Sequence, residues 1–351
     1  MNAETAQLAD LLRRLGASDD EVTTALATGT GGPFAVSLVL RSAPPVTVAA
    51  AAASAGGTPE EFLRFWRALG LATPDEGAAA VPADLVDALP VMSDATQQWL
   101  GEDGALGLAR VVGSAAARVA EALVDSFRVG FEMPQLTAGA SYPDVVEQYV
   151  EITKLALPAF QEFLVAVIKA HIVRVASGAW SPDVVNMSAR RDLFVGFVDL
   201  SGYTVLAGTL TPADLATMLV RFEDAVADVA TTGGGRLVKL IGDGAMFVCD
   251  SATDGCRAAL ELCDRLGADE SLPPARIGAD HGSVLSLSGD YYGDVVNRAA
   301  RLVAVARPGT VVVSEAVAAA LDENLFGLDQ LPQQALKGFH APAVTFRLTR
   351  R

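Results

Sequence analysis

The stretch Gly233–Asp250, GGGRLVKLIGDGAMFVCD, decides the fold of the C-terminal half of the chain. Two apolar runs of strand length, Leu237–Ile241 and Ala245–Cys249, flank a Gly-Asp-Gly triplet centred on Asp243. An Asp-Gly pair between such runs predicts a β-hairpin, because its tight turn needs positive φ angles. Burying the charges of Lys239 on the first strand and Asp243 at the tip would cost free energy of desolvation unless these side chains face water or a ligand. The hairpin is therefore either an ordinary one with a solvated turn or part of a binding site.

Alternating strands and helices surround this hairpin and begin at Leu193. The run Leu193–Asp199 has the apolar composition and length of a buried strand and ends in a carboxylate. The turn Ser201-Gly202-Tyr203-Thr204 then leads into a helix, so its backbone N–H groups can face an anion. The remaining expected elements are helices at 211–231, 252–266 and 294–306 and strands at 276–287 and 310–313. The order β-α-β-β-α-β with trailing strands predicts an α+β domain with a ferredoxin-like sheet and helices on one face.

Residues 1–180 are predicted to form an all-helical domain, joined by a linker at 181–191 to the strand–helix domain at 192–351. Two long apolar helices are expected at Ala105–Val129 and Val145–Ser177, and Pro158 is expected to kink the second. Helices that are apolar on most faces are buried against each other or against a partner chain. No group of potential catalytic residues precedes the linker.

The segment Pro44–Leu71 has the outline of a helix-turn-helix. Its second helix starts with TPEE (58–61), a capping signal with proline at the first helical position. A DNA-reading helix presents basic and amide side chains, whereas these two glutamates are opposed only by Arg64 and Arg67. A packing module is therefore favoured over a transcription regulator, and a gel shift with random DNA would distinguish the two.

Composition narrows the class of protein. The chain has 351 residues, of which 51% are hydrophobic and 19% charged, so it can bury a sizeable core. Its net charge of −16 argues against nucleic acid and anionic membranes as partners, and it suits a site that recruits divalent cations. Three cysteines without a CxxC motif are most simply core residues in a reducing compartment.

The N-terminal sequence and the most apolar segment indicate where in the cell the protein is expected. The N-terminal sequence MNAETAQLAD lacks the basic and apolar regions of a signal peptide. The most apolar long segment, Leu155–Ala176, contains Glu162, Lys169, His171 and Arg174, so it is a poor membrane span. These features predict a soluble cytoplasmic protein without stable membrane insertion.

Several polar residues stand out among apolar ones. Asp199 ends the first strand and Asp243 tips the neighbouring hairpin, and two carboxylates that meet over a sheet repel each other unless cations sit between them. Asn297 and Arg301 are four residues apart on one helix face, and Asp290 precedes that helix. Each fragment alone is compatible with a solvated surface. Together they supply metal ligands, an anion-facing turn and cationic donors, which are the groups that phosphoryl transfer requires.

Four motifs carry a resemblance to a known family. FVDLSGYT (197–204), GGGRLVKLIGDGAMF (233–247), GDYYGDVVNRAAR (289–301) and LKG (336–338) occur in this order. The series resembles that of class III nucleotidyl cyclases over residues 192–351. The resemblance implies a cyclase catalytic domain there, and the helical region 1–180 resembles the regulatory domain of soluble actinobacterial cyclases.

The resemblance implies roles for the charged residues of the hairpin. In the family two aspartates hold the metals, which correspond to Asp199 and Asp243, and the implied cofactors are two Mg²⁺ or Mn²⁺ ions per active site. A lysine and an aspartate read the purine, which correspond to Lys239 and Asp290. Lysine can donate to adenine N1 and aspartate can accept from the N6 amine, whereas guanine presents the opposite pattern. ATP is therefore the expected substrate and 3′,5′-cyclic AMP the expected product.

The resemblance also covers the remaining motifs. Asn297 and Arg301 correspond to the residues that act on the transition state, and Lys337 to the lysine that grips the triphosphate. In the family the metal ligands come from one subunit and the purine and transition-state residues from another. Because this chain carries both sets, the resemblance implies a homodimer with two shared sites. The middle strand departs from the family pattern, since Asp280-His281-Gly282 stands where many relatives have His-Thr-Gly.

The sequence leaves open how the protein is regulated and which of several functions its cyclase-like domain has. The helical domain is expected to restrain the catalytic dimer, and a response to pH would use His171, His281 or His340, or perturbed carboxylates. A catalytically silent cyclase-like domain that senses nucleotide or dimerises is the main alternative, although no implied metal ligand or transition-state residue is missing. A guanylyl cyclase is disfavoured by Lys239 and Asp290.

Overall fold

The computed structural model describes residues 3–179, 190–321 and 324–351, with the side chains of 89–97 and 177–179 excepted. The chain divides into two compact units, Met1–Val185 and Asn186–Arg351. Most of the predicted linker lies outside the described residues. Its last two residues, Arg190 and Arg191, instead begin the first strand of the second unit.

The first unit is helical, as expected, but it also contains a small sheet. Its helices are α1 (Ala3–Arg14), α2 (Asp19–Ala27), α3 (Gly31–Leu40), α4 (Val48–Ser54), α5 (Pro59–Ala68), α6 (Ala83–Phe127), the π-helix η1 (Arg128–Glu132), α7 (Met133–Thr137) and α8 (Tyr142–Ala179). Strands β1 (Val46–Thr47) and β2 (Ala79–Val81) pair antiparallel. The all-helical expectation missed this pair because each strand is only two or three residues long. Val81 of β2 is fully buried and packs with Phe62 and Trp66 of α5.

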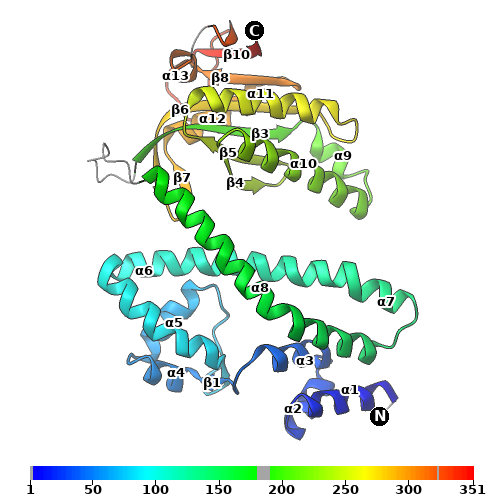
Figure 1. The fold of residues 1–351 in the computed structure, drawn as a ribbon. Coiled ribbons are helices and arrows are strands. Elements are labelled where there is room, and N and C mark those ends of the chain that lie inside the picture. The colour runs from blue at the N-terminus through cyan, green and yellow to red at the C-terminus, as the bar shows by residue number, and fades with distance from the viewer. Residues whose placement is uncertain (1–2, 180–189, 322–323) are drawn as a thin grey trace. The chain divides into compact units, whose positions relative to one another are not determined.

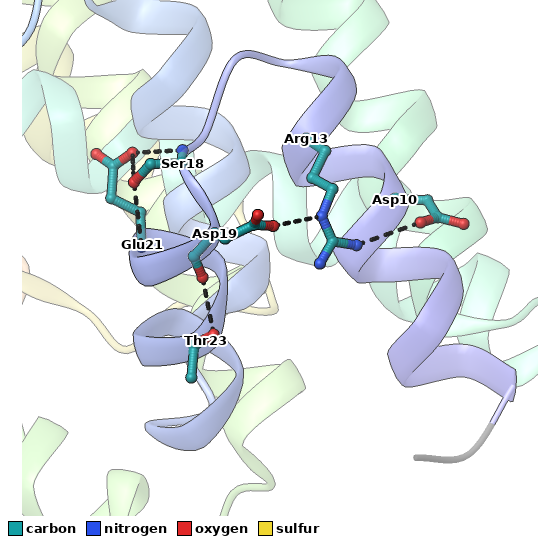
Figure 2. Close-up of polar contacts among 6 residues, drawn as sticks. All are labelled: Asp10, Arg13, Ser18, Asp19, Glu21 and Thr23. Carbon is teal, nitrogen blue, oxygen red and sulfur yellow. Dashed lines mark hydrogen bonds and ion pairs between the residues drawn. The ribbon is translucent and has the colours of Figure 1, made fainter.

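Polar contacts fix the junction of α1 and α2 (Figure 2). The Ser18 hydroxyl accepts the backbone N–H of Glu21, and the Glu21 carboxylate accepts the backbone N–H of Ser18 at 2.8 Å, which forms a capping box. Arg13 of α1 donates to Asp19 at 2.9 Å. The cap defines where α2 starts, and the ion pair ties that start to α1.

Local signals located the helices better than they located the breaks in them. The predicted capping box at the start of α5 is confirmed, since Thr58 and Glu61 bond reciprocally. Helix α6 begins earlier than expected and breaks at Gly101, whose φ of 68° lies in the left-handed region. Helix α8 continues through Pro158.

Helix α8 is also the most apolar long helix. Among the described residues it alone is long and apolar enough to cross a membrane, and an 18-residue window within Tyr142–Ala176 has a mean hydropathy of 1.5. None of that 18-residue window is buried within the structure, whereas Val146 and Val150 near the start of the helix are buried. Core helices of soluble proteins and signal sequences can have the same length and composition, so these two properties do not by themselves place α8 in a membrane.

The second unit is built on one mixed sheet (Figure 1). Its strands are β3 (Arg190–Leu200), β4 (Arg236–Ile241), β5 (Gly244–Cys249), β6 (Ala275–Leu287), β7 (Asp290–Tyr292), β8 (Thr310–Ser314), β9 (Phe326–Gln330) and β10 (Thr345–Arg350). The order across the sheet is β4-β5-β3-β6-β8-β10-β9, and β7 pairs with β6. The first four strands are mutually antiparallel in the order of a ferredoxin-like sheet. The predicted α+β class is confirmed.

The helices of this unit are α9 (Tyr203–Ala207), α10 (Pro212–Thr232), α11 (Ala252–Ala268), α12 (Asp294–Val305) and α13 (Glu315–Ala319). Helices α10 and α11 bury one face of the sheet, where Phe222 and Leu262 pack with Phe247. Helix α12 covers the opposite face, where Val295 and Ala299 pack on Met246 of β5.

The two long helices of the predicted β-α-β-β-α-β unit, α10 and α11, therefore share one face as expected, whereas α12, which follows that unit, lies on the other face. Gly278 of β6 explains how α12 lies so close to the sheet. A Cβ atom at this position would stand 2.2 Å from the backbone nitrogen of Val303.

Candidate functional site

Two carboxylates lie together where the hairpin meets β3. Asp199 of β3 pairs in register with Gly244, the residue after Asp243. The backbone N–H of Leu200 donates to the Asp243 carbonyl at 3.2 Å. Gly242 supplies the positive φ of 61° that the tight turn needs. Strand pairing thus brings two residues that are far apart in the sequence to the same edge of the site.

The surroundings of Asp243 disfavour its ionised form. Burial raises the pKa of this carboxyl above its usual range, and the negative charge of Asp199 raises that pKa further. A nearby cation would relieve both effects.

Arg276 already provides one cationic neighbour, which sequence reasoning missed. Its Nε and Nη2 atoms lie 2.7 and 2.6 Å from Asp199 Oδ2. The two residues are direct partners in the register of β3 and β6. The available signal was the pairing of these two strands in a ferredoxin-like sheet, which sets the end of β3 opposite the start of β6.

Lys239 and Asp290 form an ion pair, although they are 51 residues apart. The register of β4 shifts by one residue between Leu237 and Lys239, as at a β-bulge. This shift places Lys239 opposite Met246, on the sheet face that α12 covers. In an unbroken strand counted from Arg236, Lys239 would instead face the α10–α11 core.

Asp290 is held by the short strand β7, which was not predicted. The next residue, Tyr291, is 2% exposed and anchors β7 in the cluster under α12. The guanidinium carbon of Arg236 lies 4.8 Å from the centre of the Tyr291 ring, a cation–π distance. Asp290 also accepts the backbone N–H of Tyr291 at 2.8 Å. The carboxylate that meets Lys239 is therefore fixed from both sides.

Asn297 and Arg301 lie on α12, which begins two residues after β7 ends. Both residues are exposed, and neither side chain has a polar partner among the residues that the structure describes. Helical spacing puts them on one face of α12. They are free to contact a ligand.

Lys337 occupies a turn between β9 and β10. The Phe339 backbone N–H donates to the Leu336 carbonyl at 3.0 Å, so Lys337 and Gly338 form the centre of the turn. Gly338 has a φ of 91°, which glycine adopts readily. Leu336 is buried against Leu302 of α12, and Lys337 itself is exposed.

The turn 201–204 fits its expected role only in part. The Ser201 backbone N–H donates to the Pro274 carbonyl at 2.9 Å, so this group is already engaged. Gly202 takes a φ of 79°, and Tyr203 packs on the α10–α11 core. Thr204 is exposed at the start of the five-residue helix α9. The Ser201 hydroxyl is buried without a hydrogen-bond partner within the described residues.

The acidic pair fits a divalent cation that is also bound by a substrate. Across the described ranges no group of three or more His, Cys, Asp or Glu side chains could hold a metal ion. Mg²⁺ commonly takes one or two carboxylates and completes its shell with water and substrate phosphates. Asp199 and Asp243 supply such a partial set, and a cation there would offset the burial that chiefly raises the pKa of Asp243.

The structure brings some of the expected residues together and leaves others apart. Asp199 and Asp243 are neighbours, and so are Lys239 and Asp290. Within the described part of the chain, no polar contact joins these pairs to each other, or either pair to the exposed side chains of α12 or to Lys337.

Comparison with known proteins gives the family. The model of the adenylate and guanylate cyclase catalytic domain matches residues 185–350. An uncharacterized protein of Mycobacterium tuberculosis is 37% identical over 98% of this chain and 90% of its own length. A Streptomyces coelicolor protein named adenylate cyclase is 35% identical over 76% of this chain and 69% of its own length.

A further relative from Mycobacterium tuberculosis, named a pH-sensitive adenylate cyclase, is 28% identical over 75% of this chain and 67% of its own length. The matches extend beyond the catalytic unit, because each covers more of the chain than residues 185–350. The chain belongs to the class III adenylate and guanylate cyclase family, in its actinobacterial adenylate cyclase branch.

Proposed function

We propose that this protein converts ATP into 3′,5′-cyclic AMP and pyrophosphate at a site that holds two divalent cations. The observation that carries the proposal is the ion pair of Lys239 and Asp290 on the same sheet as the acidic pair. It supplies one donor and one acceptor side by side, which complements adenine N1 and N6. Guanine would present a donor to the lysine and an acceptor to the carboxylate.

The chain's own groups account for binding and charge stabilisation. Asp199 and Asp243 are the metal ligands, and Mg²⁺ or Mn²⁺ bound there supplies the positive charge that favours an ionised ribose 3′-hydroxyl and the departing pyrophosphate. Arg276 neutralises the charge of its partner Asp199 before substrate binds. Lys337, from its exposed turn, contacts the triphosphate.

The two exposed residues of α12 act at the reacting atoms. Arg301 neutralises charge that develops on the α-phosphate, and Asn297 orients the ribose through its amide. The turn 201–204 contributes N–H groups from Gly202 onward, since the Ser201 N–H is already engaged. These roles follow the family motifs and are supported by the absence of competing polar partners among the described residues.

The decisive assay measures cyclic AMP from Mg-ATP and cyclic GMP from Mg-GTP with the full chain. The wild type should make cyclic AMP, and Asp243→Ala should lose at least about a hundredfold in kcat, because a metal ligand is missing. Lys239→Glu should raise the KM for ATP far more than the KM for GTP. Asp250→Ala, in an exposed position outside the site, is the matched control and should keep wild-type rates. A wild type without cyclase activity under Mg²⁺ and Mn²⁺ would refute the proposal.

We propose further that two copies of the chain share each active site. The supporting observation is that, in the described part of one chain, no polar contact joins the acidic pair to the residues of α12. A mixture of Asp243→Ala and Arg301→Ala chains should therefore recover about a quarter of wild-type activity, because half of the dimers then contain one intact site. A mixture of Asp243→Ala with Asp199→Ala should recover none. Equal, negligible activity in both mixtures would show that each site belongs to one chain.

The helical unit is proposed as a cytoplasmic regulatory domain. A relative named a pH-sensitive adenylate cyclase matches 75% of this chain. His171 and His340 are exposed and His281 is half-buried. Activity profiles of the full chain and of residues 186–351 between about pH 5 and 8 should differ. Identical profiles would exclude a pH response that passes through the helical unit.

Location has a separate test. Helix α8 carries Glu162 and Lys169 within its apolar stretch, which favours a protein surface over lipid as its cover. The full chain should remain in the supernatant after high-speed centrifugation of a cell lysate. Recovery only in the membrane pellet, with release by detergent, would contradict a cytoplasmic protein.

A further inference from the structure

A buried carboxylate outside the proposed reaction site anchors an unexplained network. Asp280 of β6 is fully buried. Its Oδ1 accepts from the Ser314 hydroxyl and from the His281 backbone N–H, the latter at 2.8 Å. Its Oδ2 accepts from Arg298 Nη1 at 2.9 Å. A buried charge persists only when it is paired and hydrogen-bonded in this way.

Arg298 connects this carboxylate to the helix that carries the proposed transition-state residues. It directly follows Asn297 and precedes Arg301 by three residues on α12. The side chains of Asn297 and Arg301 are exposed, whereas the guanidinium of Arg298 reaches β6. The ion pair therefore limits both rotation and sliding of α12 on the sheet.

Arg298 has a second partner on the turn that presents Lys337. Its guanidinium carbon lies 5.2 Å from the centre of the Phe339 ring, within cation–π range. Phe339 closes the turn through its N–H bond to Leu336. The guanidinium of Arg298 thus links its own helix, α12, to β6 and to the turn of Lys337. The ion pair with Asp280 fixes the position of this guanidinium.

We propose that Asp280 and Arg298 are positioning residues that set Lys337 against α12, so that the triphosphate and the transition state are contacted in one geometry. This inference rests on the function proposed above for Lys337. The network acts through the Phe339 ring, and neither Asp280 nor Arg298 touches the substrate.

The test uses the full chain and separates KM for Mg-ATP from kcat. Phe339→Leu keeps an apolar side chain in the cluster but removes the ring under the guanidinium, and it should raise KM about three- to fivefold with little change in kcat. Phe339→Tyr restores an aromatic ring and should keep the wild-type KM. Asp280→Asn combined with Arg298→Gln removes both the cation on the ring and the ion pair that holds α12, so it should raise KM as Phe339→Leu does and also lower kcat.

A double-mutant cycle identifies Lys337 as the residue through which the network acts. Lys337→Ala should raise KM, and adding Phe339→Leu should raise it no further, because the ring then has no lysine to position. Phe346→Leu, which removes a half-buried ring on the opposite face of the sheet, is the matched control and should leave KM unchanged.

The possible failures are distinct. Additive effects in the cycle, or a wild-type KM for Phe339→Leu, overturn the inference and leave the proposed function in place. A wild-type KM for Lys337→Ala overturns the role proposed for Lys337, and the inference falls with it.

Discussion

Replacing Gly278 by alanine should separate the position of α12 from the stability of the fold. The new Cβ would stand 2.2 Å from the Val303 nitrogen, 2.6 Å from the Leu302 carbonyl carbon and 2.7 Å from the Ala299 oxygen. Ordinary contact begins at 3.4 Å, so α12 must move by about 1.2 Å. All three atoms belong to the helix backbone and cannot rotate aside.

Two consequences follow from this displacement. Overpacking of this kind costs about 1–3 kcal/mol, which lowers the Tm of a unit of this size by about 3–10 °C. A shift of about 1 Å in groups that contact a transition state costs about a hundredfold in rate. Because α12 carries Asn297 and Arg301, which we propose act on the transition state, Gly278→Ala should lower kcat by about that factor at a temperature where the protein remains folded.

Gly255→Ala is the matched control for this experiment. Its Cβ would stand at the same distance, 2.2 Å, from the fully buried Phe194 ring on the face that α10 and α11 cover, so the clash is with a core side chain and not with the backbone of α12. Circular dichroism gives Tm for both variants, and cyclic AMP production at 25 °C gives kcat. We expect similar losses of Tm but a kcat for Gly255→Ala within about threefold of wild type. The reasoning is refuted if Gly278→Ala and Gly255→Ala have the same kcat.

Three further predictions concern single groups. Folding raises the pKa of Asp243, so the charged form of this carboxyl destabilises the folded protein at pH values above that pKa. Asp243→Asn should therefore raise the Tm of the metal-free protein at pH 7. This gain in Tm should vanish as the pH falls toward about 4, because the wild-type carboxyl is then protonated. Calorimetry in a chelator that shows a lower Tm for the variant at pH 7 would contradict this. Ser18→Ala removes the cap of α2 and should cost about 1 kcal/mol of unfolding free energy by denaturant titration, whereas the control Thr23→Ala, inside the helix, should cost less. Burial raises the cysteine pKa values to about 12, 12 and 11, so a thiol reagent at pH 8 should label none of these residues in the native protein and all of them after denaturation: Cys249, Cys256 and Cys263.

The parts of the fold that depend on neighbouring residues could be predicted from the sequence. The Asp-Gly turn gives the β4–β5 hairpin, and the Thr211-Pro212 pair gives the capped start of α10. Apolar run lengths identify β3, β6 and α12 to within a few residues. These signals are local, because turn geometry and capping bonds involve residues that are close in the chain.

The parts of the site that depend on pairing between distant segments could not be predicted in this way. Arg276 meets Asp199 because β3 and β6 pair in a particular register across 77 residues. The close approach of α12 to the sheet depends on Gly278 of β6, and no periodicity within α12 reveals it. The short strand β7 is too brief to show alternation, although its residue Asp290 could be singled out by its motif.

The register shift in β4 has a consequence for how relatives are compared. Val238 is the extra residue between Leu237 and Lys239, so a cyclase with a regular strand here would present the equivalent lysine one position earlier. A gapless alignment of the two, counted from Arg236, would set Val238 in the column of that lysine. If Lys239 contacts the base as proposed, a substrate preference deduced from that column would be wrong for this chain, and counting from the Asp-Gly turn avoids the error.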